Sequence, residues 1–186
     1  MRIISGTYKG RRITAPKNLP VRPTTDMAKE ALFNILRNRY MFSRLTVLDL
    51  FSGTGNISYE FASRGSKTIT AVDGNYNCVK FINTTAGHFD MDINAFKSDV
   101  FKYLERASGA QYDIVFADPP YDLSTEQFKK IAELVFDNNL LAKNGSLIIE
   151  HGRETDLSDG RNFREFRRYG GSVFSFFSPQ GNDEEE

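Results

Sequence analysis

Four consecutive residues near the middle of the chain, Asp118-Pro119-Pro120-Tyr121, combine a carboxylate, a rigid backbone and an aromatic ring. The two prolines cannot continue a strand, so the apolar run before them must end here. The carboxylate of Asp118 and the carbonyl of Pro119 can each accept a hydrogen bond. We interpret this turn as a catalytic site that holds both N–H groups of an exocyclic amine and aims its lone pair at an electrophile. Tyr121 can then stack on the splayed or flipped base, whereas a purely structural turn would leave the acid and the ring unexplained.

A second set of residues has the chemistry of a cofactor site. The stretch DLFSGTG places Gly53 and Gly55 between an apolar run and an expected helix, where they permit a tight turn close to a ligand. Ser58 stands where the dinucleotide fingerprint has its third glycine. Asp49 precedes the turn, and a carboxylate suits an amino group better than a phosphate. The candidate cofactor-binding residues are Asp49, Phe51, Gly53, Gly55, Asp73 and Asp99.

The acids of this set fall where expected strands end. Asp73 ends the second strand, where a carboxylate can accept two ribose hydroxyls. Asp99 follows the third strand and can either accept a hydrogen bond from an adenine amine or simply cap the next helix. With Asp49, these residues line one edge of the predicted sheet. Three acids suit a cationic nucleoside without phosphates, so we predict S-adenosylmethionine as the cofactor.

The elements that position these residues alternate between strand and helix. Expected strands cover 45–51, 68–73, 94–99, 112–118, 145–151, 163–169 and 172–178, and expected helices cover 27–38, 56–64, 76–86, 99–107 and 125–138. This alternation predicts an α/β fold with a doubly wound, mostly parallel seven-stranded sheet, whose last strand is antiparallel and follows a Gly-Gly turn. Residues 2–15 predict two further short strands around Lys9 and Gly10. Either Thr25 or Asp26 can cap the first helix.

Charge is distributed unevenly along the 186 residues, although the net charge is zero. Residues 1–44 hold 10 Lys and Arg against 2 acids, a net charge of +8, whereas the remainder holds 14 against 22, a net charge of −8. A basic segment on an acidic body favours a polyanionic partner for that segment. The amino-terminal residues do not resemble a signal peptide, and no run could span a bilayer, so we expect a cytoplasmic protein that does not bind membranes.

The remaining reactive side chains do not suggest another chemistry. Cys78 is the single cysteine, which excludes an internal disulfide. We expect it on a helix far from the strand ends, as a core or surface residue, which disfavours a cysteine nucleophile. His88 and His151 are far apart in the sequence and have no cysteine partners, so no metal site is predicted. His151 follows the fifth strand and could touch a substrate, but a structural role is the better interpretation.

Four stretches together resemble a known family. They are MRIISGTYKGRRI at the start, RPTTDMAKEALFNIL at 22–36, DLFSGTG at 49–55 and DPPY at 118–121. With them the chain resembles the bacterial RsmD-type methyltransferases, which methylate the N2 amine of a guanine in the 16S RNA of the small ribosomal subunit. The last two stretches are shared by many amino-methyltransferases, whereas the first two are more specific.

The resemblance implies a Rossmann-like S-adenosylmethionine-dependent domain over 45–180. The basic extension over 1–44, a β-hairpin and a helix, would contact RNA, and the acidic tail over 181–186 would be disordered. The RNA-contacting residues that it implies are Lys9, Arg11 and Arg12 at the phosphates and Arg22, Thr24 and Asp26 near the mouth of the active site. A monomer acting on small-subunit particles is expected. One departure is VDGN at 72–75, where the family has Val-Glu-x-Asp, so Asn75 replaces the second acid.

Three alternatives stay open at this point. An adenine-N6 methyltransferase acting on DNA or RNA would use the same DPPY turn. A ribosome assembly factor that binds S-adenosylmethionine without required catalysis would keep the basic extension and tolerate loss of Asp118. A nicotinamide oxidoreductase would share the glycine turn and Asp73 but would leave Asp49 unexplained.

Overall fold

The computed structural model describes residues 1–22 and 24–179, so the predicted acidic tail lies outside the described residues. Its centre is a seven-stranded sheet with the strand order β3-β2-β1-β4-β5-β7-β6. The strands are β1 (Thr46–Leu50), β2 (Thr68–Asp73), β3 (Ile93–Lys97), β4 (Tyr112–Ala117), β5 (Leu141–His151), β6 (Phe163–Tyr169) and β7 (Ser172–Phe177). The helices are α1 (Asp26–Arg39), a short 3-10 helix η1 (Phe42–Arg44), α2 (Asn56–Ser63), α3 (Tyr76–Phe89), α4 (Val100–Arg106) and α5 (Thr125–Asp137).

The sheet confirms the predicted fold class. Strands β1 to β5 are parallel, and β7 runs antiparallel between β5 and β6. The chain first winds outward from β1 to β3 and then returns to β4 on the other side of β1, so the order reverses between β1 and β4. In open α/β sheets, ligands bind at such a reversal, outside the carboxyl ends of the strands.

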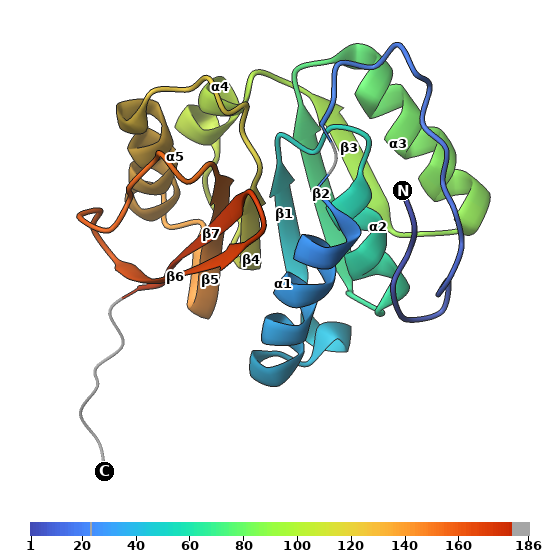
Figure 1. Cartoon of the computed structure of the whole chain (residues 1–186), viewed down its shortest axis with the longest axis horizontal. Coiled ribbons are helices and arrows are strands. Elements are labelled where there is room, and N and C mark those ends of the chain that lie inside the picture. The colour runs from blue at the N-terminus through green and yellow to red at the C-terminus, as the bar shows by residue number, and fades with distance from the viewer. Residues whose placement is uncertain (23, 180–186) are drawn as a thin grey trace.

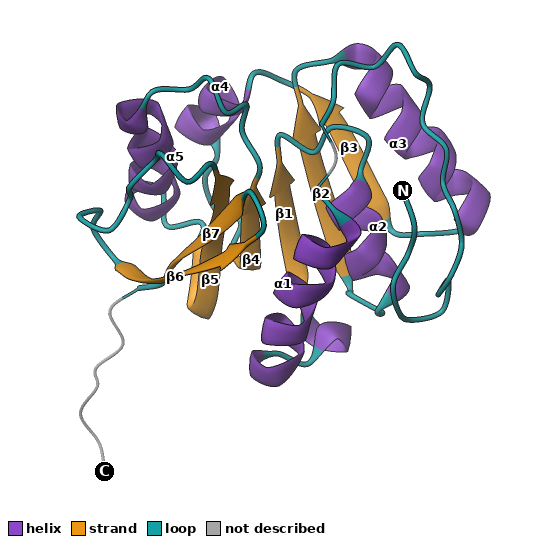
Figure 2. Ribbon diagram, viewed as in Figure 1, coloured by secondary structure: helices purple, strands orange, loops and turns teal. Residues whose placement is uncertain are grey.

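Helices cover both faces of the sheet, as Figures 1 and 2 show. Helices α1, α2 and α3 pack in one apolar cluster, whereas α4 and α5 belong to a second. Val47 of β1 points into the first cluster, and its neighbours Leu48 and Leu50 contribute to the second. Strands buried on both faces explain why the sequence reads as nearly continuous apolar runs rather than as a clean alternation.

The two short strands predicted over 2–15 are wrong as regular strands, although the segment does fold back on itself. It forms one isolated bridge, between Arg2 and Arg12. The N–H of Ile3 donates to the Arg11 carbonyl, and Met1 and Ile13 exchange backbone hydrogen bonds. The N–H groups that follow Ile3 turn to helix α2 instead: those of Ile4 and Ser5 donate to the Glu60 carboxylate, and the N–H of Thr7 donates to a carbonyl of the same helix. The pairing therefore does not extend into a regular ladder.

Smaller differences concern the ends of the elements. Strand β5 begins at Leu141 rather than at 145, because Leu141 already pairs with Tyr112 before an irregularity in the β4–β5 register. Helix α3 extends to Phe89, three residues beyond its predicted end. The side chain of Thr25, not that of Asp26, caps α1 by accepting from the N–H of Ala28. Among the described residues, no helix has the length and apolar character needed to cross a membrane.

Candidate functional site

A cavity of about 590 Å³ lies at the carboxyl ends of the central strands, at the reversal of strand order. Its walls include most of the predicted cofactor and catalytic residues: Asp49, Phe51, Gly53, Asp73, Asp99, Asp118, Pro119, Pro120 and Tyr121. Residues 20–22 and Thr24, from the segment before α1, close another side. The fold therefore brings together residues that lie up to about a hundred positions apart in the sequence.

Asp49, on β1, is a buried acid at the bottom of this cavity, with 1% of its surface exposed. Its carboxylate accepts a hydrogen bond of 2.6 Å from the Ser58 hydroxyl of α2. Burial raises the pKa of Asp49 to about 7, which the hydrogen bond from Ser58 partly offsets. No cation among the described residues pairs with this carboxylate. An amino group of a ligand would supply the missing positive charge.

Asp73, at the end of β2, shapes the glycine turn. One carboxylate oxygen accepts from the N–H of Gly53 and the other from the N–H of Asn75, each at 2.8 Å. Each oxygen keeps a further lone pair, so the carboxylate can still accept ribose hydroxyls. Asn75 stands where the family has an acid, and its side chain caps α3.

Asp99 caps the next helix, which is one of the two roles that the sequence left open, and contact with adenine remains a prediction. Its carboxylate caps α4 by accepting from the N–H of Lys102 at 2.9 Å, and the residue also lines the cavity. Gly53 and Gly55 both have positive φ, as the tight turn requires. Gly55 does not line the cavity: a Cβ there would lie 2.7 Å from the Tyr59 ring, so this glycine permits close packing behind the turn.

The DPPY turn begins where β4 ends. The N–H of Asp118 donates to the Leu50 carbonyl at 3.3 Å, which places its side chain beside the end of β1. Burial raises the pKa of Asp118 well above its usual range, and the nearby carboxylates of Glu150 and Asp49 raise it further. The guanidinium of Arg22 acts in the opposite direction.

Tyr121 extends from this turn along the cavity wall. The Arg22 guanidinium carbon lies 3.8 Å from the centroid of its ring. The hydroxyl of Tyr121 is buried and has no hydrogen-bond partner among the described residues. Burial raises the pKa of Tyr121, so the phenol remains protonated at neutral pH.

Glu150, near the end of β5, is a functional candidate that sequence reasoning missed. It is 1% exposed, and its two carboxylate oxygens accept from the hydroxyls of Thr24 at 2.7 Å and Ser172 at 2.8 Å. Burial raises its pKa, and the two hydrogen bonds partly offset that effect. The available signal was an acid at the end of the strand next to β4, the same signal that identified Asp49 and Asp73.

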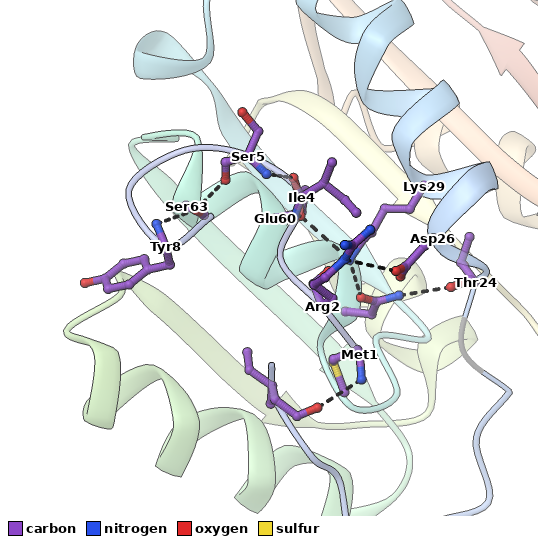
Figure 3. Close-up of polar contacts among 12 residues, drawn as sticks. Met1, Arg2, Ile4, Ser5, Tyr8, Thr24, Asp26, Lys29, Glu60 and Ser63 are labelled. Carbon is purple, nitrogen blue, oxygen red and sulfur yellow. Dashed lines mark hydrogen bonds and ion pairs between the residues drawn. The ribbon is translucent and has the colours of Figure 1, made fainter. Parts of the chain in front are cut away.

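A buried polar network joins the amino-terminal segment to the cavity, as Figure 3 shows. Lys29 of α1, 1% exposed, donates to the carbonyl of Arg2 at 2.5 Å and to the Asn56 side chain at 2.8 Å. It also lies 3.7 Å from the carboxylate of Glu60. Asn56 lines the cavity and donates to the Thr24 carbonyl at 3.3 Å. Burial lowers the pKa of Lys29, and the Glu60 charge opposes this shift.

The predicted RNA-contacting residues fall into three groups. Lys9, Arg11 and Arg12 are exposed on the amino-terminal segment and do not line the cavity. Arg22 lies inside the cavity, and Thr24 is buried against Glu150. Asp26 is exposed at the start of α1, 3.3 Å from Arg2. Contact with RNA remains a prediction for all of these residues.

The structure contradicts the predicted position of Cys78 and agrees with the structural role expected of His151. Cys78 is not far from the strand ends as predicted: it lies in the first turn of α3 and lines the cavity, and burial raises the pKa of its thiol to about 11. A protonated thiol is a weak nucleophile. His151 is 2% exposed and hydrogen-bonds to Ser175 and the Gly152 carbonyl, as expected of a structural histidine. Across residues 1–22 and 24–179, no cluster of His, Cys, Asp or Glu could hold a metal ion.

Comparison with known proteins places the chain in a family. The family described as Conserved hypothetical protein 95 matches residues 1–178. The chain belongs to this family, that of the RsmD-type methyltransferases. Ribosomal RNA small subunit methyltransferase D of Buchnera aphidicola subsp. Baizongia pistaciae is 30% identical over 151 residues, which cover 81% of this chain and 75% of the relative.

Two solved structures support the fold. The Thermus protein TTHA0928 superposes with a TM-score of 0.83 at 24% identity, covering 96% of this chain and 99% of that one. Magnesium protoporphyrin IX methyltransferase of Synechocystis, solved with bound S-adenosylmethionine, superposes with a TM-score of 0.64 at 16% identity and covers 81% of this chain and 78% of its own. This RsmD-type chain therefore has the class I methyltransferase fold.

The residues of the cavity fit S-adenosylmethionine, the cofactor that we assign to it. Asp49 is a buried carboxylate without a cation, as the amino group of the cofactor requires. Asp73 offers carboxylate oxygens at the end of β2, where ribose hydroxyls bind in this class of sheet. Asp99 and Phe51 also line the cavity, and their contact with adenine remains a prediction. No part of this wall resembles a phosphate site, because its charged groups are mainly acids.

Proposed function

We propose that the protein transfers a methyl group from S-adenosylmethionine to the N2 amine of a guanine in small-subunit ribosomal RNA. The observation that carries the proposal is the position of Asp118 and Tyr121 on the wall of the same cavity as the cofactor residues. The ribosomal substrate is supported by the name of the Buchnera relative. We further propose a cytoplasmic monomer that acts on assembling small-subunit particles.

In this proposal, S-adenosylmethionine supplies an electrophilic methyl group when it is bound. The carboxylate of Asp118 and the carbonyl of Pro119 accept the two N–H groups of the amine. The lone pair of an aromatic amine is delocalised into the ring, so accepting both hydrogens favours a tetrahedral nitrogen that can attack. The prolines fix the carbonyl direction in advance, which makes positioning and electrostatics the main contributions.

The charge of the site favours guanine over adenine. Asp118 provides an acceptor on the cavity wall, and the buried Glu150, which accepts from Thr24 and Ser172, adds negative charge near it. Guanine presents an N1–H next to its N2 amine, whereas adenine presents only its N6 amine at this edge. An acceptor-rich site therefore gains more from guanine. Exposed Lys9, Arg11 and Arg12 would bind the phosphates on either side of the target.

The decisive experiment is the transfer of labelled methyl to three acceptors: small subunits lacking the modification, deproteinised ribosomal RNA and duplex DNA. We expect N2-methylguanine from one or both RNA samples and none with Asp118→Ala. Cofactor binding by Asp118→Ala should stay close to that of the wild type, and its loss would contradict the assigned role. Recovery of N6-methyladenine would move the substrate to adenine. No label in any acceptor, with cofactor bound, would favour an assembly factor without required catalysis.

A further inference from the structure

The guanidinium group of Arg22 lies over the ring of Tyr121. The guanidinium carbon of Arg22 lies 3.8 Å from the ring centroid, within the range of a cation–π contact. Both residues line the cavity of about 590 Å³. A base that stacks on the face of Tyr121 covered by Arg22 must therefore displace the guanidinium.

The guanidinium also resembles the edge of the proposed substrate. It is a planar carbon bonded to three nitrogens that carry N–H donors, and N1, C2 and N2 of guanine repeat part of that pattern. Its positive charge lowers the pKa of two carboxyl groups, those of Asp118 at the end of β4 and Glu150 near the end of β5. The same ring and the same negative surroundings would thus serve first the arginine and then the base.

We propose that Arg22 is a placeholder for the acceptor base: it stacks on Tyr121 until a base displaces it, and its guanidinium then binds an RNA phosphate. The proposal rests on the proposed function, which assigns Tyr121 to the base. In this proposal, Arg22 weakens the binding of a free base on the Tyr121 ring. It favours a base within RNA, whose phosphate can bind the displaced guanidinium.

Thr24, two residues after Arg22, is held in the fold: its hydroxyl donates to Glu150, and its carbonyl accepts from Asn56. We therefore assign the change to the Arg22 side chain. When the guanidinium leaves, the site loses a positive charge beside Asp118 and Glu150, and N–H groups of a base offset that loss. A nucleic acid also offers the displaced cation a phosphate, which a free base does not.

The test uses nucleosides, which contain the base but no phosphate. Binding of guanosine and adenosine to the full-length protein with S-adenosylhomocysteine is measured by ligand-observed NMR titration. We expect Arg22→Ala to bind nucleosides tighter by about two- to fivefold, since displacing a cation–π contact no longer opposes them. The same variant should bind a ribosomal RNA fragment more weakly and with a smaller salt dependence. Arg22→Lys keeps the charge but not the planar stack, so its affinity for nucleosides should lie between those of the wild type and Arg22→Ala.

Two control variants make the result specific. Arg11→Ala, at an exposed position away from the cavity, should weaken RNA binding and leave nucleoside binding unchanged. Tyr121→Ala combined with Arg22→Ala should remove the gain in nucleoside binding. Unchanged or weaker nucleoside binding by Arg22→Ala would overturn the proposal, as would a failure of both proteins to bind any nucleoside. The direction of the Arg22 effect does not depend on which base is methylated, so a wrong substrate assignment would be recognised separately.

Discussion

At the scale of single residues, Asp49 links folding to cofactor binding. Its carboxylate is 1% exposed and has the Ser58 hydroxyl as its only side-chain donor among the described residues. Burial raises its pKa from 3.8 to about 7. Between these two values the folded protein keeps a proton that the unfolded chain loses. Raising the pH through this window therefore costs stability until a ligand cation compensates the charge.

We predict that Asp49→Asn reduces this pH dependence. The free energy of unfolding of the ligand-free wild type should fall between pH 4 and 7. The variant should be more stable than the wild type at pH 8 by roughly 1 to 4 kcal/mol, and it should bind S-adenosylmethionine more weakly. Urea unfolding at pH 5 and 8, with calorimetric titration of the cofactor, measures both effects. Asp113→Asn is the control, because the Asp113 carboxylate accepts from a backbone N–H at the opposite edge of the sheet. If the free energy of unfolding of Asp49→Asn and of the wild type depended equally on pH, the raised pKa would not belong to Asp49.

Asp118 and Glu150 form the second residue-scale case, because each carboxylate is buried near the other. In the proposed mechanism the ionised carboxylate of Asp118 is a stronger acceptor for the amine than the protonated acid, so the rate should fall on the acid side as Asp118 is protonated. Glu150→Gln removes a neighbouring negative charge and thereby lowers the pKa of Asp118. Its amide oxygen can still accept from Thr24 or Ser172.

We predict that Glu150→Gln moves the acidic limb of the kcat profile to lower pH. A purely structural role for Glu150 would lower the rate at every pH and leave the limb in place. Single-turnover methyl transfer at a series of pH values separates the two outcomes. Glu165→Gln, which removes a half-buried carboxylate paired with Arg39 on the edge strand, should leave the limb unchanged.

The sequence predicted those site residues whose position follows from strand ends. Asp49, Asp73 and Asp118 lie where parallel strands end, so the fold alone brings them together. Glu150 also lies near the end of a strand, but neither a Gly-x-Gly turn nor a proline pair follows it, so the sequence did not indicate a site there. The stack of Arg22 on Tyr121 depends on the path of the loop before α1, which strand and helix periodicity does not determine.

At the scale of elements, α2 holds the amino-terminal segment in place. Glu60, with 0% exposure, accepts from the N–H groups of Ile4 and Ser5 and from Arg64, and it lies near Lys29. A buried carboxylate with this many partners is costly to remove, because several donors would be left without acceptors. The helix that follows the cofactor turn is thus also the docking surface of the basic segment.

We predict that Glu60→Ala destabilises the protein by about 3 to 5 kcal/mol, since buried Lys29 loses its ionic partner and two backbone N–H groups lose their acceptor. The amides of Ile4 and Ser5 should exchange hydrogen much faster, which native-state exchange measures residue by residue. Glu133→Ala removes an exposed i,i+3 pair with Lys130 at 3.9 Å on α5 and is the matched control. That control should cost less than about 1 kcal/mol. Equal costs for the two variants would contradict the anchoring role.

Two glycines of the amino-terminal segment provide another test at this scale. Gly6 and Gly10 both have positive φ, +87° and +81°. A Cβ at Gly6 would lie 1.9 Å from the backbone oxygen of Ser63, whereas a Cβ at Gly10 would meet nothing within 4 Å. The two positions therefore share the backbone strain and differ only in the contact with α2.

We predict that Gly10→Ala costs about 1 to 2 kcal/mol, the strain of a left-handed residue. Gly6→Ala should cost more and should release the segment from α2, with faster exchange of the Thr7 amide, which donates to Ser63. Thermal unfolding and hydrogen exchange of both variants provide the comparison. A Gly6→Ala protein that is as stable and protected as Gly10→Ala would show that the segment does not dock on α2 in solution.

The same docking explains why the predicted amino-terminal strands were wrong, although the central elements were predicted well. Alternating apolar runs determine where β1, β2 and β4 lie because those strands are buried on both faces. Residues 2–12 have a hairpin-like pattern and pair in part, but the N–H groups of Ile4, Ser5 and Tyr8 donate to Glu60 and Ser63 on a helix about fifty residues later in the chain. Local periodicity carries no information about such a distant acceptor.

At the scale of the whole molecule, the fold places the basic amino-terminal residues near the cavity. Six of the ten Lys and Arg of residues 1–44 precede residue 23, on a segment that docks on α2 and lines the cavity with residues 20–22. Its exposed cations therefore lie on the chain that leads to the proposed acceptor site. An acidic body keeps nonspecific attraction to nucleic acid low elsewhere, so RNA approaching this segment is directed toward the mouth of the cavity.

This arrangement predicts that phosphate contacts are made by the cations of residues 1–22 and not by those at the opposite edge of the sheet, where Arg44 lies. Arg11→Ala with Arg12→Ala should weaken RNA binding and reduce the slope of log K against log salt by about 0.7 to 0.9 for each lost contact. Arg44→Ala with Lys143→Ala removes the same charge where β1 and β5 begin, and it should change the slope far less. Fluorescence anisotropy of a labelled RNA fragment between low and moderate salt measures both slopes. Equal losses in the two double variants would mean that net charge alone, rather than the placement of the basic segment, determines RNA affinity.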